Sequence, residues 1–263
     1  MTLVRGEGIV LKTHALGDTS RIVVVYTREL GMVRMVAKGA RKSPSRFGFA
    51  LEPMSRANFI FYHKRDRDLH LVSQAETVEA HGSGMRDVVR LAHGQAALEL
   101  VDRLVWGEEP HEELYDLLRD ALASVARAPD RALPAVTIAF QLQVASLLGY
   151  RPRLESCASC SGSLSERRLF SPARGGILCD RCAASEAGVV RLSADALAGM
   201  ALLMSRPVEE AGEYVEVERA GEILKVVEAF LRHHFQRFQG LRSLEMLRAL
   251  PGFEAQEGAP CGN

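Results

Sequence analysis

Four cysteines in the second half of the chain have the spacing of a metal site. Cys157 and Cys160 form one C-x2-C turn, and Cys179 and Cys182 form a second turn after an intervening stretch of eighteen residues. Two such turns can place four thiolates around one tetrahedral ion, and four soft sulfur ligands favour Zn2+. Because four cysteines leave no coordination position for water or substrate, the spacing predicts a structural zinc rather than a catalytic one.

Two disulfides are the alternative use of the same cysteines. They would require an oxidising compartment, and a chain of 263 residues with only one further cysteine, Cys261, does not have the composition of a disulfide-stabilised secreted protein. We therefore expect residues 152–187 to form a compact zinc module whose folding is linked to metal binding.

Positive charge is concentrated in the first part of the chain. The formal net charge of the whole sequence is zero, but residues 1–70 contain thirteen Lys or Arg and six Asp or Glu. This segment therefore carries +7 and the remainder carries −7. Such asymmetry indicates a basic module that binds phosphate and an acidic remainder with a different role.

The basic segment also has the sequence pattern of a small β-barrel. Short runs rich in Val, Ile, Thr and aromatic residues, separated by Gly or Asp, predict five strands, over residues 8–13, 20–27, 32–37, 55–62 and 69–77. Five strands in about seventy residues fit a closed barrel of the OB-fold type, with the SH3-like barrel as the alternative. Phe59 and Phe61 share one strand face and are expected in the core, whereas Tyr62 points to the other face.

A loop between the third and fourth expected strands, residues 38–49, combines four cations with Phe47 and Phe49. Cations neutralise phosphates, and aromatic rings stack on the bases of single strands. The two rings could equally fold back into the barrel. The cations of this loop and of the neighbouring strands, together with one tyrosine, are the expected DNA-binding residues: Lys12, Arg34, Lys38, Arg41, Lys42, Arg46, Tyr62, Lys64, Arg65 and Arg67.

From residue 84 onward the apolar residues recur with the period of helices. The pattern predicts helices over 88–105, 114–125, 133–148, 194–204 after an N-cap at Ser193, 213–238, and a last turn over 242–250. The expected fold class is multidomain α+β. Residues 1–80 would form an OB-fold DNA-binding domain, residues 81–250 a helical domain that contains the zinc module, and residues 251–263 a disordered tail rich in Gly, Pro and Glu.

The sequence has no motif for nucleotide-dependent or hydrolytic catalysis. It lacks the G-x-x-x-x-G-K-[ST] phosphate loop, a G-x-G-x-x-G turn after a strand, and the G-x-S-x-G nucleophile motif. It also lacks a leading signal-peptide pattern and any apolar run approaching the ~20 residues that span a bilayer. We expect a non-enzymatic, cytoplasmic protein.

Several short motifs, in their order along the chain, resemble those of the bacterial RecO family of recombination mediators and DNA repair proteins. They are Gly8-Ile9-Val10-Leu11-Lys12, Thr27 with Gly31, Ala37-Lys38-Gly39-Ala40-Arg41-Lys42, Leu147-Leu148-Gly149-Tyr150-Arg151-Pro152, Cys157-Ala158-Ser159-Cys160, Gly175-Gly176 before Cys179-Asp180-Arg181-Cys182, and Arg242-Ser243-Leu244. The likeness covers nearly the whole chain. In the first turn, this chain has Gly17 before Asp18 where many family members have an acidic residue.

The resemblance implies an N-terminal OB-fold, binding of single- and double-stranded DNA, and annealing of complementary strands. It further implies a nucleoid-associated protein that acts with RecR and RecF in placing RecA on DNA coated by single-strand binding protein (SSB). Many members of the family bind zinc. A different interpretation of the same residues is a zinc-stabilised protein adaptor whose basic barrel binds an acidic protein partner.

Contact with SSB would require a site for its short C-terminal tail, which ends in acidic residues and an aromatic. Such a tail needs an apolar slot with cations at its rim. The last expected helices contain candidates for both parts, namely Phe230, Phe235 and Phe238 for the slot and Arg232, Arg237, Arg242 or Arg248 for the rim.

Overall fold

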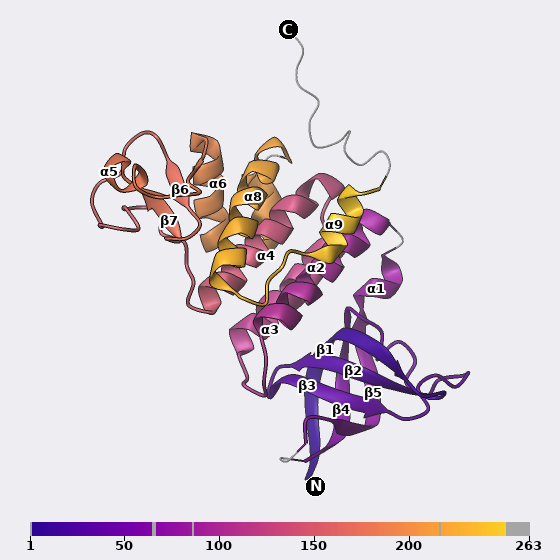
Figure 1. Cartoon of the computed structure of the whole chain (residues 1–263). Helices are drawn as coiled ribbons and strands as arrows, with labels where there is room; N and C mark the ends of the chain where they lie inside the picture. The colour runs from indigo at the N-terminus through magenta and orange to yellow at the C-terminus, as the bar shows by residue number, and fades with distance from the viewer. Residues whose placement is uncertain (1, 65–66, 86, 216, 251–263) are drawn as a thin grey trace. The chain divides into compact units, whose positions relative to one another are not determined.

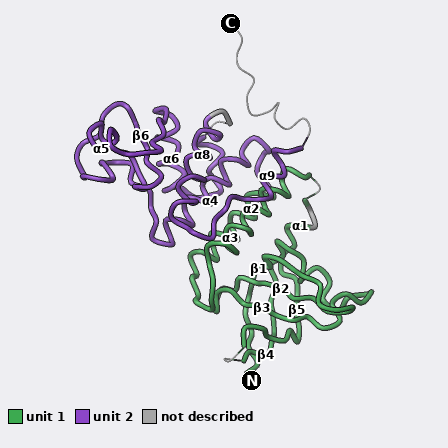
Figure 2. Tube along the Cα trace, in the orientation of Figure 1, with its two compact units in different colours: residues 1–126 green, residues 127–263 purple. Residues whose placement is uncertain are grey.

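The computed structural model describes residues 2–64, 67–85, 87–215 and 217–250 (Figure 1). Arg65 and the expected disordered tail, residues 251–263, lie outside these ranges. By its internal contacts the chain divides into two compact units, residues 1–126 and 127–263, which Figure 2 shows in separate colours.

Five strands build the sheet of the first unit: β1 (Thr2–Leu16), β2 (Ser20–Thr27), β3 (Gly31–Ala37), β4 (Ser55–His63) and β5 (His70–Ala80). They pair in the order β1-β2-β3-β5-β4, and β4 also pairs with β1, so that the sheet closes on itself as a barrel. The pairing of β3 with β5 is parallel and short, whereas the other pairs are antiparallel. The five predicted strands are confirmed, and β1 extends beyond its predicted ends.

Alternating residues of the strands fill the barrel, as the two-residue period of a strand requires. Phe59 and Phe61 are 1% and 0% exposed and belong to this core, as predicted. The segment between β3 and β4 adds Phe47 and Leu51 to it. Phe49 is 62% exposed, so the two aromatic rings of the basic loop have different environments.

Three helices follow the barrel within the first unit: α1 (His81–Gly84), α2 (Val88–Leu104) and α3 (Glu112–Arg127), whose last residue falls just past the division. The side chain of Asp87 caps α2 by accepting a 3.0 Å hydrogen bond from the backbone N–H of Val89. α2 packs against β1, and Ile9 and Leu11, on the opposite strand face to Val10, are buried. The compact unit thus extends to residue 126, and the predicted domain boundary after residue 80 stays a prediction.

The second unit is built around α4 (Leu133–Leu147), which follows the short turn η1 (Asp130–Ala132) and is buried along most of its length. It packs against α6 (Ala194–Ser205), α7 (Ala211–Tyr214) and α8 (Val217–His234). The turn η2 (Val208–Glu210) precedes α7, and α9 (Arg242–Arg248) is the last helix of the described residues. The single helix predicted over 213–238 is wrong, because α7 and α8 are separate and α8 ends at His234.

The predicted N-cap is confirmed, since the Ser193 hydroxyl accepts a 3.1 Å hydrogen bond from the backbone N–H of Ala196 at the start of α6. None of the helices in the described residues combines the length and apolar character needed to cross a bilayer.

The cysteine region lies between α4 and α6. It contains β6 (Leu169–Ser171), β7 (Gly176–Leu178) and β8 (Val190–Arg191), paired in the order β7-β6-β8, and the single-turn helix α5 (Asp180–Ala183). Gly176 allows the backbone of Arg153 to approach closely, because a Cβ at residue 176 would lie 2.3 Å from the carbonyl oxygen of Arg153. This close approach joins the segment before Cys157 to the strand that leads to Cys179.

Candidate metal centre and nucleic-acid interface

The four predicted metal ligands come together in space. The Sγ atoms of Cys157, Cys160, Cys179 and Cys182 all lie within 4.8 Å of one another. Cys160 and Cys179, from different turns, have their sulfurs 3.8 Å apart. Ligands 2.3 Å from a tetrahedral zinc stand about 3.8 Å from each other, so the donor set and its spacing fit this ion.

Backbone turns hold the first pair of cysteines. The N–H of Ser161 donates to the carbonyl of Cys157 at 2.8 Å, and the N–H of Cys157 donates to the carbonyl of Gly162 at 3.0 Å. Cys157 is buried and Cys160 is exposed, so the cluster lies at the surface of its module with one ligand anchored inside.

The thiols of the cluster have unequal proton affinities. Burial opposes ionisation of Cys157, but hydrogen bonds from the backbone of Cys179, Cys160 and Ser159 outweigh it and lower the pKa of this thiol to about 6. Its neighbours Cys179 and Cys160 raise the pKa of Cys182 to about 11. Crowded thiolates repel further ionisation, and a cation among them relieves that repulsion.

Arg181, between the last two cysteines, was not among the predicted site residues. Its side chain bonds with the thiol of Cys160, and this bond and the charges of the nearby sulfurs raise the pKa of the guanidinium. The cation therefore balances part of the negative charge that four thiolates would carry.

The predicted DNA-binding residues divide into exposed cations and cations held by acids. Arg34, Lys38 and Lys42 are exposed and form no ion pair within the described residues. Arg41 is exposed and donates to the carbonyl of Gly17 at 2.6 Å, and the guanidinium of Arg46 lies 4.6 Å from the centre of the Phe47 ring. All five remain accessible to a phosphate.

Lys12 differs from these five cations because it forms an ion pair with a helix of the same unit. Its Nζ atom lies 2.7 Å from a carboxylate oxygen of Asp102 on α2. The physical reason is that α2 covers this part of β1, so the cation serves the packing of a helix on the barrel. The role of Lys12 as a DNA contact stays a prediction, although this ion pair neutralises part of its charge.

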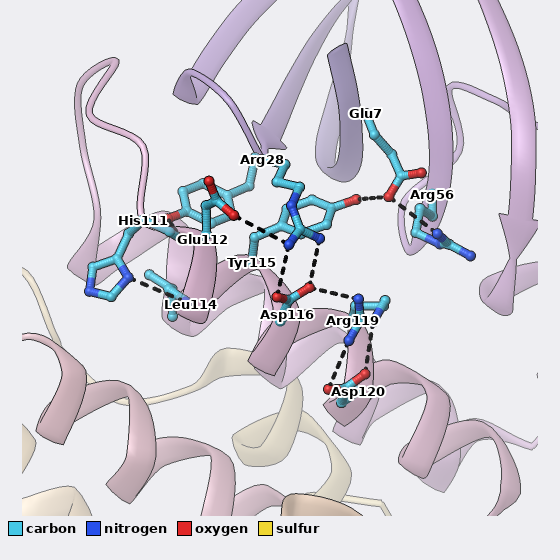
Figure 3. Close-up of polar contacts among 11 residues, drawn as sticks. Glu7, Arg28, Arg56, His111, Glu112, Leu114, Tyr115, Asp116, Arg119 and Asp120 are labelled. Atoms are coloured by element: carbon cyan, nitrogen blue, oxygen red, sulfur yellow. Dashed lines mark hydrogen bonds and ion pairs between the residues drawn. The ribbon is translucent and has the colours of Figure 1, made fainter.

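Other cations of the basic segment are also neutralised internally (Figure 3). Arg28 bonds Asp116 of α3 at 2.9 Å, and Asp116 accepts a second bond from Arg119 at 2.6 Å. Arg56 of β4 lies 3.2 Å from Glu7 of β1 and also pairs with Glu79. The sequence charge of +7 therefore overstates the charge that the barrel presents to a ligand.

The remaining candidates lie around the end of β4. Tyr62 is 36% exposed, and Arg67 is exposed. Lys64 is half-buried at the start of the β4–β5 connection. Their role in DNA binding stays a prediction, and the structure adds the exposed ring of Phe49 as a further stacking candidate that the sequence left open.

The predicted apolar slot for an SSB tail is not open at the three phenylalanines. Phe230, Phe235 and Phe238 are 2%, 9% and 1% exposed, because their rings pack into the core of the second unit. We correct that part of the prediction. Arg232 lies 3.7 Å from Glu245 and Arg248 lies 3.5 Å from Glu228, whereas Arg242 is exposed.

A barrel with exposed cations, a helical second unit and a four-cysteine module together define a two-part protein with a metal-type cluster in its helical part. Two family models match the chain. "Recombination protein O N terminal" matches residues 1–81, and "Recombination protein O C terminal" matches residues 85–245.

Curated relatives match this chain over nearly its full length and theirs. The chain is 38% identical over 250 residues to the DNA repair protein RecO of Streptomyces griseus, covering 93% of this chain and 98% of the relative. It is 33% identical to the DNA repair protein RecO of Pelotomaculum thermopropionicum, over 90% of this chain and 91% of that relative. It is 34% identical to the DNA repair protein RecO of Anaeromyxobacter dehalogenans, over 96% of this chain and 100% of that relative. The chain belongs to the RecO family, and a role in DNA repair and recombination follows from that membership.

Proposed function

We propose that this chain is a non-enzymatic recombination mediator that binds single- and double-stranded DNA through its barrel without sequence preference. The observation that carries the proposal is the exposure of five barrel-segment cations, Arg34, Lys38, Arg41, Lys42 and Arg46, and of the ring of Phe49. Cations supply sequence-independent phosphate contacts, and an exposed ring adds stacking on bases of a single strand.

Annealing of complementary strands follows physically from such a surface. A cationic face that holds two strands lowers their mutual repulsion and raises their local concentration, so pairing speeds up without bond chemistry. This activity needs no nucleotide, in keeping with a sequence that contains no phosphate-loop motif.

Family membership supports the wider assignment. We infer that the chain acts in the cytoplasm, at the nucleoid, with RecR and RecF, and that it helps to place RecA on DNA coated by SSB. For the fold we propose an OB-type barrel, which the closed order of five strands supports.

We infer that the cysteine cluster holds one structural Zn2+. The four sulfurs have the spacing of a tetrahedral thiolate site, and the two turns that carry them are joined through the close contact at Gly176. When bound, the ion supplies a cross-link between the two turns, while the chain's own backbone N–H groups keep Cys157 ready as a thiolate.

The proposal is tested by a salt titration of DNA binding. Replacing Lys38, Arg41, Lys42 and Arg46 together by Ala should weaken binding to all sequences and flatten the dependence of affinity on ionic strength, because each lost phosphate contact removes its share of counterion release. Fluorescence anisotropy with mixed-sequence single- and double-stranded oligonucleotides measures both quantities.

A charge-matched control separates a local contact from a general change in net charge. The control variant replaces four exposed cations of the helical part by Ala: Arg127, Arg131, Arg206 and Lys225. It should leave the salt dependence close to that of the parent. Equal losses in the two variants, or an unchanged slope in the first, would contradict the placement of the site.

The same assay addresses the adaptor interpretation. A basic barrel that serves an acidic protein partner would bind an acidic peptide. It would bind DNA only weakly, and that affinity would depend little on ionic strength. If the chain binds an acidic peptide but has no measurable affinity for either form of DNA at low salt, the adaptor interpretation would replace the mediator proposal.

A further inference from the structure

A second group of metal-ligating side chains lies in the first unit. His63 ends β4, His70 begins β5, and Glu108 lies in the connection between α2 and α3. The Nε2 atom of His63 is 2.8 Å from Oε2 of Glu108, and the Nε2 atom of His70 is 2.9 Å from Oε1 of the same carboxylate. One ligand atom from each residue lies within 4.8 Å of the others.

The surrounding fold fixes these three residues before any ligand arrives. The His70 side chain is 0% exposed, and its backbone is held by pairing with Met35 of β3. The two imidazole rings stack with their centres 4.4 Å apart. The side chains of His63 and Glu108 are 17% and 36% exposed, so solvent reaches the group.

The Glu108 segment is also held against the barrel. The N–H of Met32 donates to the carbonyl of Gly107 at 3.0 Å. Gly31, with φ +69°, lets Glu109 approach so closely that a Cβ at residue 31 would lie 2.4 Å from the Glu109 carbonyl oxygen. The residues on both sides of Glu108 are therefore positioned by the β2–β3 turn, and a substitution at Gly31 would displace them.

We propose that His63, His70 and Glu108 form a second metal site, which binds one divalent ion of the zinc type through two imidazole nitrogens and one carboxylate. Imidazole suits Zn2+, Ni2+ and Co2+, and three protein ligands leave a coordination position for water or another oxygen donor. The site differs from the cysteine cluster in ligand type, unit and openness.

Metal binding at this group requires one change of protonation, at the ring of His70. Burial opposes ionisation of Glu108, but the hydrogen bonds from His63 and His70 outweigh it and lower the pKa of the carboxyl, which stays ionised as a ligand. The N–H of Lys64 donates to Nδ1 of His70 at 3.3 Å, so neutral His70 carries its proton on Nε2. An ion at Nε2 displaces that proton, Nδ1 takes up a proton instead, and the long contact from Lys64 opens.

The ion would connect three segments that the sequence separates widely. It would join both ends of the β4–β5 connection, residues 64–69, to the connection between α2 and α3. Because Lys64 and Arg67 lie in this β4–β5 connection, the site would also place a divalent charge near two of the predicted DNA-binding cations. That last consequence rests on the proposed function, whereas the metal site itself does not.

Cobalt separates the two sites in the full-length protein. Thiolate ligation of Co2+ gives an intense charge-transfer band in the near ultraviolet, whereas nitrogen and oxygen ligands give weak visible bands alone. The chain is stripped with a chelator under reducing conditions and titrated with Co2+. We expect two equivalents, one with the thiolate band and one without it.

His63→Gln and Glu108→Gln should each bind one equivalent and keep the thiolate band, which also shows that the cysteine module still folds. His14→Gln, at an exposed histidine of β1, is the matched control and should keep both equivalents. Uptake of a single equivalent by the parent chain, or a second equivalent that persists in both variants, would overturn the proposal and leave the three residues as a hydrogen-bonded link. Because DNA is absent from the titration, its result does not depend on the mediator function.

Discussion

The hydroxyl of Tyr115 donates a 2.8 Å hydrogen bond to Oε1 of Glu7, which links α3 to the first barrel strand across 108 positions of sequence. The Tyr115 ring is fully buried and stacks with Tyr26 at 6.5 Å between ring centres. Burial and the bond to the Glu7 carboxylate raise the pKa of Tyr115 far above its ordinary value. The phenol therefore keeps its proton and acts as a donor (Figure 3).

Tyr115→Phe should destabilise the chain by about 1 kcal/mol, because the ring packing is kept and one hydrogen bond to a charged group is lost. Glu7 retains Arg56 as a partner, which limits the loss. Chemical denaturation measures the free energy of unfolding. Tyr150→Phe is the control, since that residue is 43% exposed and its contact with Phe235 uses the ring alone; equal effects of the two substitutions would argue against the link.

Cys182→Ser should reduce bound zinc from one equivalent at the cysteine cluster to well below one, and should lower the thermal stability of the second unit. The remaining three ligands leave the ion open to water and to chelators. Elemental analysis after chelator challenge, combined with a thiolate-to-Co2+ band, reports on this cluster separately from any other site. Cys261→Ser, in the segment outside the described residues, is the control and should change neither quantity.

Gln141 is a buried polar residue whose removal should stabilise the protein. Its side chain on α4 is 0% exposed, and neither its amide nitrogen nor its amide oxygen has a hydrogen-bond partner. Gln141→Met keeps the length and removes the unpaired amide, so the free energy of unfolding should rise by roughly 1 kcal/mol.

The neighbouring Gln143 provides a control of opposite sign. Its Nε2 donates to the carbonyls of Leu203 and Arg206 at 2.8 and 2.9 Å, which are at the end of α6. Gln143→Met should therefore destabilise the chain, since two acceptors lose their donor. A loss of stability in Gln141→Met as well would show that an internal water satisfies that amide.

His234 should make the folded protein less stable at acidic pH. Burial lowers its pKa below the ordinary 6.5; its bond with the Pro172 carbonyl opposes this shift, and the charge of His233 adds to it. The unfolded chain thus binds this proton more readily than the folded chain, so the free energy of unfolding falls as pH drops below 6.5.

Chemical denaturation at a series of pH values between 7.5 and 5.5 checks this dependence. His234→Gln should lose less stability than the parent over that range, and His14→Gln should follow the parent curve. A parent and a His234 variant with parallel curves would show that the imidazole is protonated as easily in the folded chain as in the unfolded one.

Local sequence patterns were sufficient for the strands and for the cysteine cluster. The two-residue alternation in β4 separates Phe59 and Phe61 from Tyr62, and the ligand spacing of two C-x2-C turns brings four sulfurs together through short-range turns. Both signals depend on residues close together in the chain, so no knowledge of tertiary structure is needed to interpret them.

Local sequence patterns do not predict contacts between residues that are far apart in the chain. Lys12 and Asp102 are 90 positions apart, and nothing near Lys12 indicates that a helix neutralises it. His63 and Glu108 are 45 positions apart, and their meeting depends on how the α2–α3 connection lies on the barrel. Two histidines at the facing ends of neighbouring strands were the one available signal. In α8, the apolar period continues past His234 although the helix ends there, because Phe235 and Phe238 remain core residues in a non-helical segment.

The packing of α2 on β1 sets the order in which the chain can complete its fold during synthesis. Ile9 and Leu11, buried in β1, leave the ribosome well before the helix that carries Asp102, which is 90 residues after its partner Lys12. At ~5 to 20 residues per second the delay is on the order of 5 to 20 s. During that interval the outward apolar residues of β1 lack the packing that α2 supplies, so the nascent barrel exposes more apolar surface than the finished unit.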